Sequence, residues 1–119
     1  MSRPQGSKTV RKKAQPSRFN MAKLEAMIED ATVDCHDESE QASGFFTMIE
    51  ENLAVPFETS VLGVSVTVDR VELSHHGQIV AICVCGRNLQ ALPLLDLPLP
   101  MPRPKGAEWI DAYRHWLGG

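Results

Sequence analysis

The spacing of apolar residues predicts two helices in the first half of the chain. Between residues 21 and 53 apolar side chains recur every three or four positions, which places them on one face of an α-helix. The first stripe predicts a helix over about residues 21–32, and the second predicts one over about residues 40–53 with Ser39 as its N-terminal cap. The stripes consist of Met21, Leu24, Met27, Ile28 and Ala31, and of Ala42, Phe45, Phe46, Ile49 and Leu53.

Beyond Phe57 the apolar period changes from helical spacing to strict alternation, which is typical of β-strands. In VLGVSVTVDRVEL the alternation shifts by one residue between Val68 and Val71. A one-residue shift moves side chains to the other face of a sheet, so the pattern predicts a β-bulge at Asp69-Arg70.

The residues after this bulge predict an antiparallel meander. HHG at 75–77 is a short hairpin connection in which Gly77 can adopt a positive φ. IVAICVC at 79–85 is apolar on both faces and predicts a central strand, and GRN at 86–88 turns the chain into LQALPLL. A meander of three to five strands with a bulge could curl into a small barrel.

The C-terminal third predicts an extended segment followed by an amphipathic helix. PLPMPRP at 98–104 has proline at every second position, which favours an extended, polyproline-like chain. In GAEWIDAYRHWL the apolar residues form one helical stripe, namely Trp109, Ile110, Tyr113, Trp116 and Leu117. The expected fold class is therefore α+β, with N-terminal helices, a small antiparallel sheet and a C-terminal amphipathic helix.

Composition and charge indicate one domain behind a basic tail. The chain has 119 residues, of which 43% are hydrophobic, enough for one core but not for two. Residues 1–20 carry six basic residues, no acid and no apolar period, and we expect a disordered basic tail there. Residues 21–119, the expected single α+β domain, have a net charge of −9.

Several features favour a cytoplasmic location. No apolar run approaches the length of a membrane helix, and the start MSRPQGSKTV has no apolar signal-peptide core. The three cysteines, an odd number, favour reduced thiols over a disulfide framework. We therefore expect no association with a membrane.

The stretch DATVDCHDESEQ at 30–41 is the main candidate for chemistry. Residues 24–58 contain ten acidic residues and no lysine or arginine, so nothing nearby neutralises this charge. Clustered carboxylates either point into water as a solvated loop or bind a cation, and calcium takes six to eight oxygen ligands. The proposed ligands are Asp34, Asp37, Glu38 and Glu40, with Glu50 and Glu51 as second-rank candidates.

An EF-hand does not explain this stretch. If Asp34 took the first position of an EF-hand loop, the sixth position would be Ser39 instead of glycine. The twelfth position would be Phe45 instead of glutamate. Any calcium site here is of another kind.

Several stretches in order resemble the CcbP-type calcium-binding proteins of cyanobacteria, which are small, acidic and lack an EF-hand. They are EAMIEDATVDCHDESEQ, GFFTMIEENLAVPFETSVLGVSVTVDRVEL, IVAICVCG, LQALPLLDLPLP and GAEWIDAYRHW. The resemblance runs from about Leu24 to Trp116. It implies a compact α+β domain that binds Ca²⁺ through the surface carboxylates of the matching acidic stretch, with a role in calcium buffering or calcium signalling.

Two other functions remain open at this point. An acidic interaction module would bind an unknown basic protein partner, with nucleic acid contacted only through the basic tail. A zinc-binding protein would use Cys35, Cys83 and Cys85 with neighbouring histidines, although CxC within an apolar strand favours inert core thiols. No common enzyme signature occurs, and we expect that the protein is not an enzyme.

Overall fold

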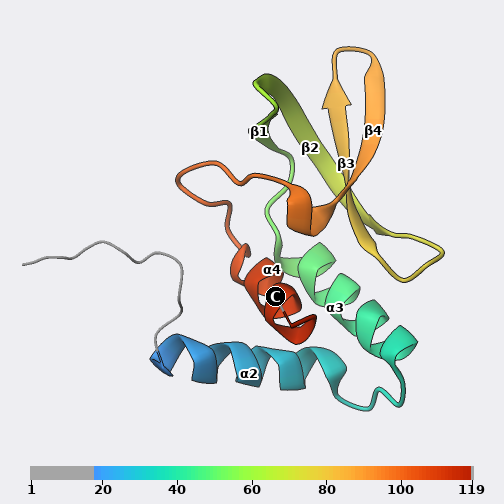
Figure 1. The fold of residues 1–119 in the computed structure, drawn as a ribbon, viewed down its shortest axis with the longest axis vertical. Helices are drawn as coiled ribbons and strands as arrows, with labels where there is room; N and C mark the ends of the chain where they lie inside the picture. The colour runs from blue at the N-terminus through green and yellow to red at the C-terminus, as the bar shows by residue number, and fades with distance from the viewer. Residues whose placement is uncertain (1–17, 119) are drawn as a thin grey trace, which may run out of the picture.

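The computed structural model describes residues 18–118, which form three α-helices, a 3-10 turn and a four-stranded antiparallel sheet (Figure 1). This confirms the expected α+β class. Residues 1–17 and residue 119 lie outside the described part of the chain. In chain order the elements are α2 (Arg18–Thr32), α3 (Glu38–Asn52), β1 (Phe57–Val61), β2 (Val64–Leu73), β3 (Ile79–Cys85), β4 (Asn88–Pro93), η1 (Leu94–Asp96) and α4 (Glu108–Trp116).

Both N-terminal helices form where the apolar stripes predict them, but each begins earlier. α2 starts at Arg18, so residues 18–20 of the predicted disordered tail are helical, and the rest of that tail is not described. α3 starts at Glu38, and its N-terminal cap is Asp37. The prediction of Ser39 as the cap was wrong, because the Asp37 carboxylate already accepts the N–H that a cap must satisfy.

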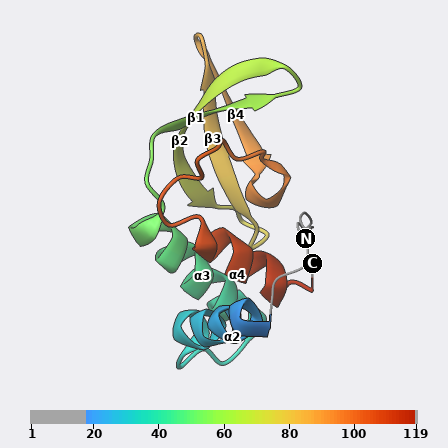
Figure 2. The same cartoon turned by 90° about the vertical axis from the view of Figure 1, so that its left-hand side faces the viewer.

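The sheet is a meander with strand order β1-β2-β3-β4, as the alternating pattern predicts. The register shifts between Val68 and Arg70, which confirms the bulge. Gly77 has φ 78° in the turn between β2 and β3, and β3 is a central strand that pairs with both β2 and β4. The sheet stays open and does not curl into the small barrel that the pattern allowed: β1 and β4 are both edges, and helices cover one end of the sheet (Figure 2).

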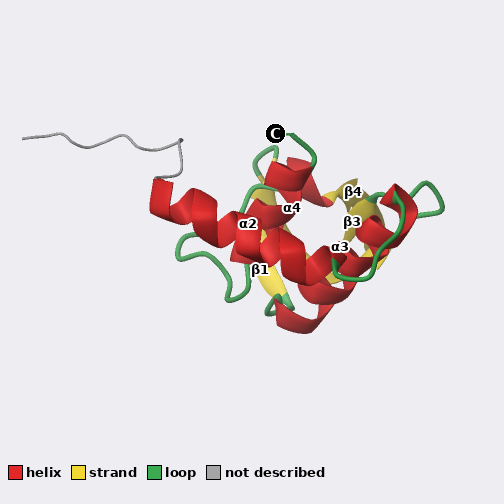
Figure 3. Ribbon diagram, turned by 90° about the horizontal axis from the view of Figure 1, so that it is seen from below, coloured by secondary structure: helices red, strands yellow, loops and turns green. Residues whose placement is uncertain are grey.

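The helices form two layers below the sheet. α3 and α4 pack side by side, α3 contacts β2, and α2 crosses beneath both helices (Figure 3). The core lies between these layers, where Phe45 is fully buried and its ring centroid is 5.7 Å from Tyr113 and 5.0 Å from Trp116. The stripe predicted for α4 is confirmed by this packing except at Leu117, which is 53% exposed.

The proline-rich segment runs without regular structure between η1 and α4 and is fixed at several points. The Thr59 hydroxyl on β1 donates a hydrogen bond to the Pro98 carbonyl at 2.6 Å. Near its other end, the Ala54 N–H donates to the Lys105 carbonyl at 2.8 Å. These bonds join the segment to β1 and to the chain after α3.

Candidate metal site

A short loop between α2 and α3 reverses the direction of the chain and carries the candidate ligands. Asp34 follows the end of α2 with φ 62°, a left-handed conformation that aspartate tolerates better than most residues. The Cys35 N–H then donates to the Thr32 carbonyl at 3.0 Å, which closes the turn. This geometry brings Asp34 and the first turn of α3 to the same end of the helix pair.

Two of the four predicted ligands also organise the start of α3. Asp37 Oδ1 accepts a hydrogen bond from the Glu40 N–H at 2.9 Å, and Glu40 Oε1 accepts one from the His36 N–H at 2.6 Å. The pair resembles a capping box, in which side chains at the first turn satisfy N–H groups that the helix leaves free. Each carboxylate keeps a second oxygen, Asp37 Oδ2 and Glu40 Oε2, for which no hydrogen bond is observed among the described residues.

The electrostatics of this loop are one-sided. The last turn of α2 carries no basic residue, although the end of a helix has a partial negative charge that favours a cation. The ion pairs observed among the described residues join Arg70 to Asp69 and Glu72, and Arg103 to Asp111. None of these pairs involves residues 34–40, so the carboxylates there have no basic partner in the described structure.

The loop carboxylates are close in sequence but do not converge. Within residues 18–118 no three His, Cys, Asp or Glu side chains are positioned to hold a metal ion together. The side chains of Asp34, Asp37, Glu38 and Glu40 are all exposed, so they can rotate toward a common point at little cost in packing. Whether they bind calcium stays a prediction.

The second-rank ligands lie elsewhere. Glu50 and Glu51 occupy the last turn of α3, which is one continuous helix from Glu38 to Asn52. Ten residues of α-helix separate Glu40 from Glu50 by about 15 Å. One ion cannot bind both, because that end of α3 does not fold back toward the loop.

The zinc set is not assembled either. Cys35 is partly buried between α2 and α3, Cys83 is buried in the core, and Cys85 is exposed near the end of β3. Burial raises the pKa of the Cys83 thiol, which favours the protonated, unreactive form. The described residues therefore offer no ready zinc site, and Cys83 is best interpreted as a core thiol.

Sequence reasoning missed the part played by Gly44. A Cβ atom at this position would collide with the backbone oxygen of Ala31 and would lie 3.6 Å from Cys35 Sγ. Gly44 thus lets α3 approach the end of α2 closely and holds the loop between them. The available signal was a glycine inside a helical pattern, where it costs about 1 kcal/mol relative to alanine and needs a packing reason.

A hollow of about 520 Å³ adjoins the loop. It lies between the first turn of α3, the turn that joins β2 to β3, and the end of α4. Glu38, a predicted calcium ligand, lines it together with His75, His76 and Trp116. The candidate metal site and this hollow therefore share a side chain.

The arrangement described so far, an open antiparallel sheet with helices packed at one end, is that of a small α+β protein and is also found in a solved structure. That structure is the crystal structure of Anabaena CcbP. The likeness has a TM-score of 0.66 over 87% of this chain and 93% of that chain, with 16% sequence identity. The two proteins therefore share a fold.

No protein-family model matches the sequence, and no curated protein matches it. Among residues 18–118 no helix is both long enough and apolar enough to cross a membrane.

Proposed function

We propose that the protein binds calcium at the loop between α2 and α3, as a buffer or sensor of the ion and not as an enzyme. The observation that carries this proposal is the loop's charge: four carboxylates lie within residues 34–40, between the end of α2 and the first turn of α3, without a basic partner in the described structure. When such side chains turn toward one point, each pair of like charges at about 4 Å costs about 1 kcal/mol in water and more near a protein surface. A divalent cation would remove this repulsion.

The donor chemistry suits calcium. Calcium prefers oxygen ligands and tolerates irregular geometry with six to eight of them, including backbone carbonyls and water. Asp34 and Glu38 have free carboxylates, and Asp37 and Glu40 each retain one oxygen after capping α3.

The affinity expected for such a site is moderate. Because the side chains must rotate inward on binding, we expect a dissociation constant of about 10⁻⁷ to 10⁻⁴ M. The sequence resemblance to CcbP-type calcium-binding proteins and the fold shared with Anabaena CcbP both support calcium as the ion.

Titration calorimetry with calcium on the full chain, in moderate salt with excess magnesium, tests the proposal. The informative variant is Asp34→Asn/Asp37→Asn/Glu38→Gln, in which asparagine at residue 37 keeps the cap. The matched control is Glu25→Gln/Glu58→Gln/Glu108→Gln, which removes the same charge from exposed positions away from the loop. Saturable binding that is lost in the first variant and kept in the control is expected.

Two results would contradict this function. If the wild-type chain releases or absorbs no heat with calcium, the carboxylates form a solvated or partner-facing surface. If the control variant loses binding as fully as the loop variant, calcium responds to the overall charge and not to this site.

A further inference from the structure

The hollow beside the loop between α2 and α3 has both polar and apolar side chains in its lining. Trp116 and the exposed Leu117 are apolar members, and Glu38, His75 and His76 are polar members. Its volume of about 520 Å³ is enough for one or two amino-acid side chains or a small molecule.

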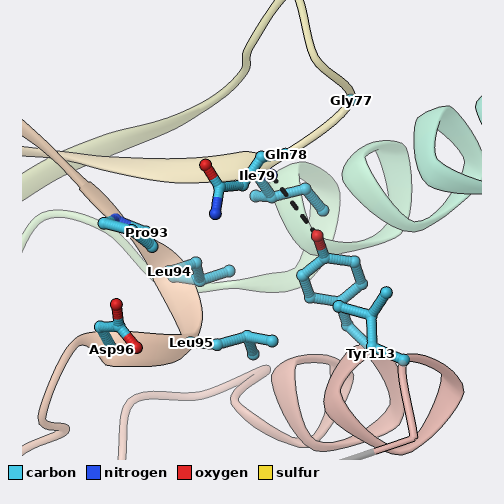
Figure 4. A pocket seen from close by; sticks show the side chains of 9 residues that line it. Gly77, Gln78, Ile79, Pro93, Leu94, Leu95, Asp96 and Tyr113 are labelled. Atoms are coloured by element: carbon cyan, nitrogen blue, oxygen red, sulfur yellow. Dashed lines mark hydrogen bonds between the residues drawn. The ribbon is translucent and has the colours of Figure 1, made fainter.

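A second hollow of about 380 Å³ continues the first one past Tyr113. The two share Gly77, Tyr113 and Leu117, and the second has a mostly apolar lining (Figure 4). The Tyr113 hydroxyl accepts a hydrogen bond from the Ile79 N–H at 3.5 Å, which fixes the ring between the two spaces. Asp96 lies at the border of the second hollow. The two adjoining hollows, together called the groove, have aromatic side chains at Tyr113 and Trp116 and the Glu38 carboxylate in their lining.

The formal charges of the lining itself are negative, but an arginine reaches its border: the Arg114 guanidinium donates a hydrogen bond at 3.0 Å to the carbonyl of Leu95, which lines the second hollow next to Asp96. All lining residues belong to the described part of the chain, and none of them is lysine or arginine. Glu38 and Asp96 supply the formal charges of the lining, and residues 21–119 together carry −9. Such a surface attracts cationic groups and repels nucleic acids and acidic ligands.

We propose that this groove binds a basic peptide segment of a partner protein, with a bulky apolar side chain over Tyr113 and Trp116 and lysine or arginine beside Glu38. An apolar anchor in a pocket with charge at its border is a common way to recognise a peptide. The Glu38 carboxylate selects the flanking basic residues, and the aromatic side chains select the anchor.

Glu38 links this groove to calcium, a step that rests on the proposed function. A calcium ion bound by Glu38 would neutralise the carboxylate that attracts the basic peptide. Calcium therefore weakens peptide binding, and by linkage the peptide weakens calcium binding by the same factor. The protein would then act as a sensor that releases its partner when calcium rises.

The test uses the isotope-labelled full chain and synthetic peptides, followed by nuclear magnetic resonance. The probe is Lys-Lys-Leu-Lys-Lys, and the comparisons are Glu-Glu-Leu-Glu-Glu and Lys-Lys-Gly-Lys-Lys. We expect saturable shifts of the Trp116 indole N–H and the Gly77 amide with the first peptide. The acidic peptide should cause none, and the glycine peptide should bind about ten-fold more weakly because it lacks the anchor.

Variants assign the binding to the groove. Leu117→Ser and Glu38→Gln change exposed residues that line the groove. Each variant should lower the affinity for Lys-Lys-Leu-Lys-Lys about five-fold. Glu58→Gln removes the same charge from β1 outside the groove and should leave the affinity unchanged. The groove is not the binding site if the chemical-shift changes are confined to the acidic faces of α2 and α3. The same conclusion follows if the acidic peptide binds as tightly as Lys-Lys-Leu-Lys-Lys.

A final titration separates the two proposals. With calcium at saturation, the affinity for Lys-Lys-Leu-Lys-Lys should fall about five-fold. If calcium binds by calorimetry but leaves the peptide affinity unchanged, the link through Glu38 is wrong while the calcium site stands. If the peptide changes the chemical shifts of the groove residues but calcium produces no heat, the groove is a peptide-binding site and the proposed calcium function is wrong.

Discussion

Asp37 and Glu40 are joined at the start of α3, where the Asp37 carboxylate accepts the Glu40 N–H at 2.9 Å while Glu40 reaches back to the His36 N–H at 2.6 Å. The same two residues are predicted calcium ligands. Their caps fix one oxygen of each carboxylate and leave the other oxygen for an ion. The structural and the proposed functional roles of these residues can therefore be separated by experiment.

Substitutions at Asp37 separate the cap from the charge. Asp37→Asn keeps a good helix cap, so the free energy of unfolding should change by only a few tenths of a kcal/mol. Asp37→Ala removes the cap and should lower it by about 1 kcal/mol. Both variants lose one carboxylate, and both should bind calcium more weakly. Urea denaturation and calcium calorimetry on the same samples measure the two effects.

One pattern of affinities would contradict a ligand role for Asp37. If Asp37→Asn retains full calcium affinity while Asp37→Ala loses it, the residue serves calcium binding only by holding the loop. The ligand set would then reduce to Asp34, Glu38 and Glu40.

Gly44 should not tolerate a side chain. In a helix alanine is normally more favourable than glycine by about 1 kcal/mol, so an isolated helix would gain stability from Gly44→Ala. Here the new methyl group would collide with the Ala31 backbone, which cannot rotate away. We expect the free energy of unfolding to fall by about 2 kcal/mol or more, as for other overpacked sites. Ser43→Ala, on the exposed neighbour, is the control and should change stability little.

Thermal and urea denaturation of both variants would check this prediction. Equal or higher stability of Gly44→Ala would mean that α2 and α3 separate easily. The close packing of the two helices would then not be what positions the calcium loop.

Much of the fold follows from local pattern, because apolar spacing fixes which face of an element is buried. The bulge between Val68 and Arg70 is an example, since a one-residue phase change keeps both halves of a strand facing the core only if the strand holds an extra residue. Barrel closure could not be predicted, because it depends on how the two edge strands meet in space. The cap was misplaced at Ser39 because Asp37 and Ser39 are both good caps, and only three-dimensional geometry chooses between them.

The candidate site was less predictable than the fold. Clustering in sequence identified Asp34 to Glu40, but it gave no information on which carboxylates already accept hydrogen bonds. It also named Glu50 and Glu51 as second-rank candidates, which could reach the loop only if the end of the second helix folded back, and a continuous helix keeps them apart from it. The hollow lined by Glu38 and His75 joins segments far apart in the chain, and no local pattern reveals such a contact.

Glu50 and Glu51 provide a test of this separation. The double variant Glu50→Gln/Glu51→Gln should leave the calcium affinity of the loop within about two-fold of wild type, because the charges lie about 15 Å from it and are screened by salt. Asp34→Asn/Glu38→Gln removes the same charge at the loop and should weaken binding about ten-fold or more. Calorimetry in about 0.15 M salt, where the Debye length is about 8 Å, compares the two. A loss of affinity shared equally by both variants would point to an extended acidic surface instead of a localised site.

The three cysteines should differ sharply in reactivity. Burial raises the pKa of Cys83, so its protonated thiol is favoured in the folded state and its contribution to stability is lost as pH rises above the ordinary cysteine value. At pH 8 an aromatic disulfide reagent should therefore modify exposed Cys85 rapidly and Cys35 more slowly, with Cys83 modified only when the protein unfolds. The Cys85→Ser variant should lose the rapid phase alone, and Cys83→Ala should reduce the fall of stability at alkaline pH. Rapid modification of Cys83 in the folded chain would mean that the core opens beneath β3, and the packing of α3 on the sheet would then need revision.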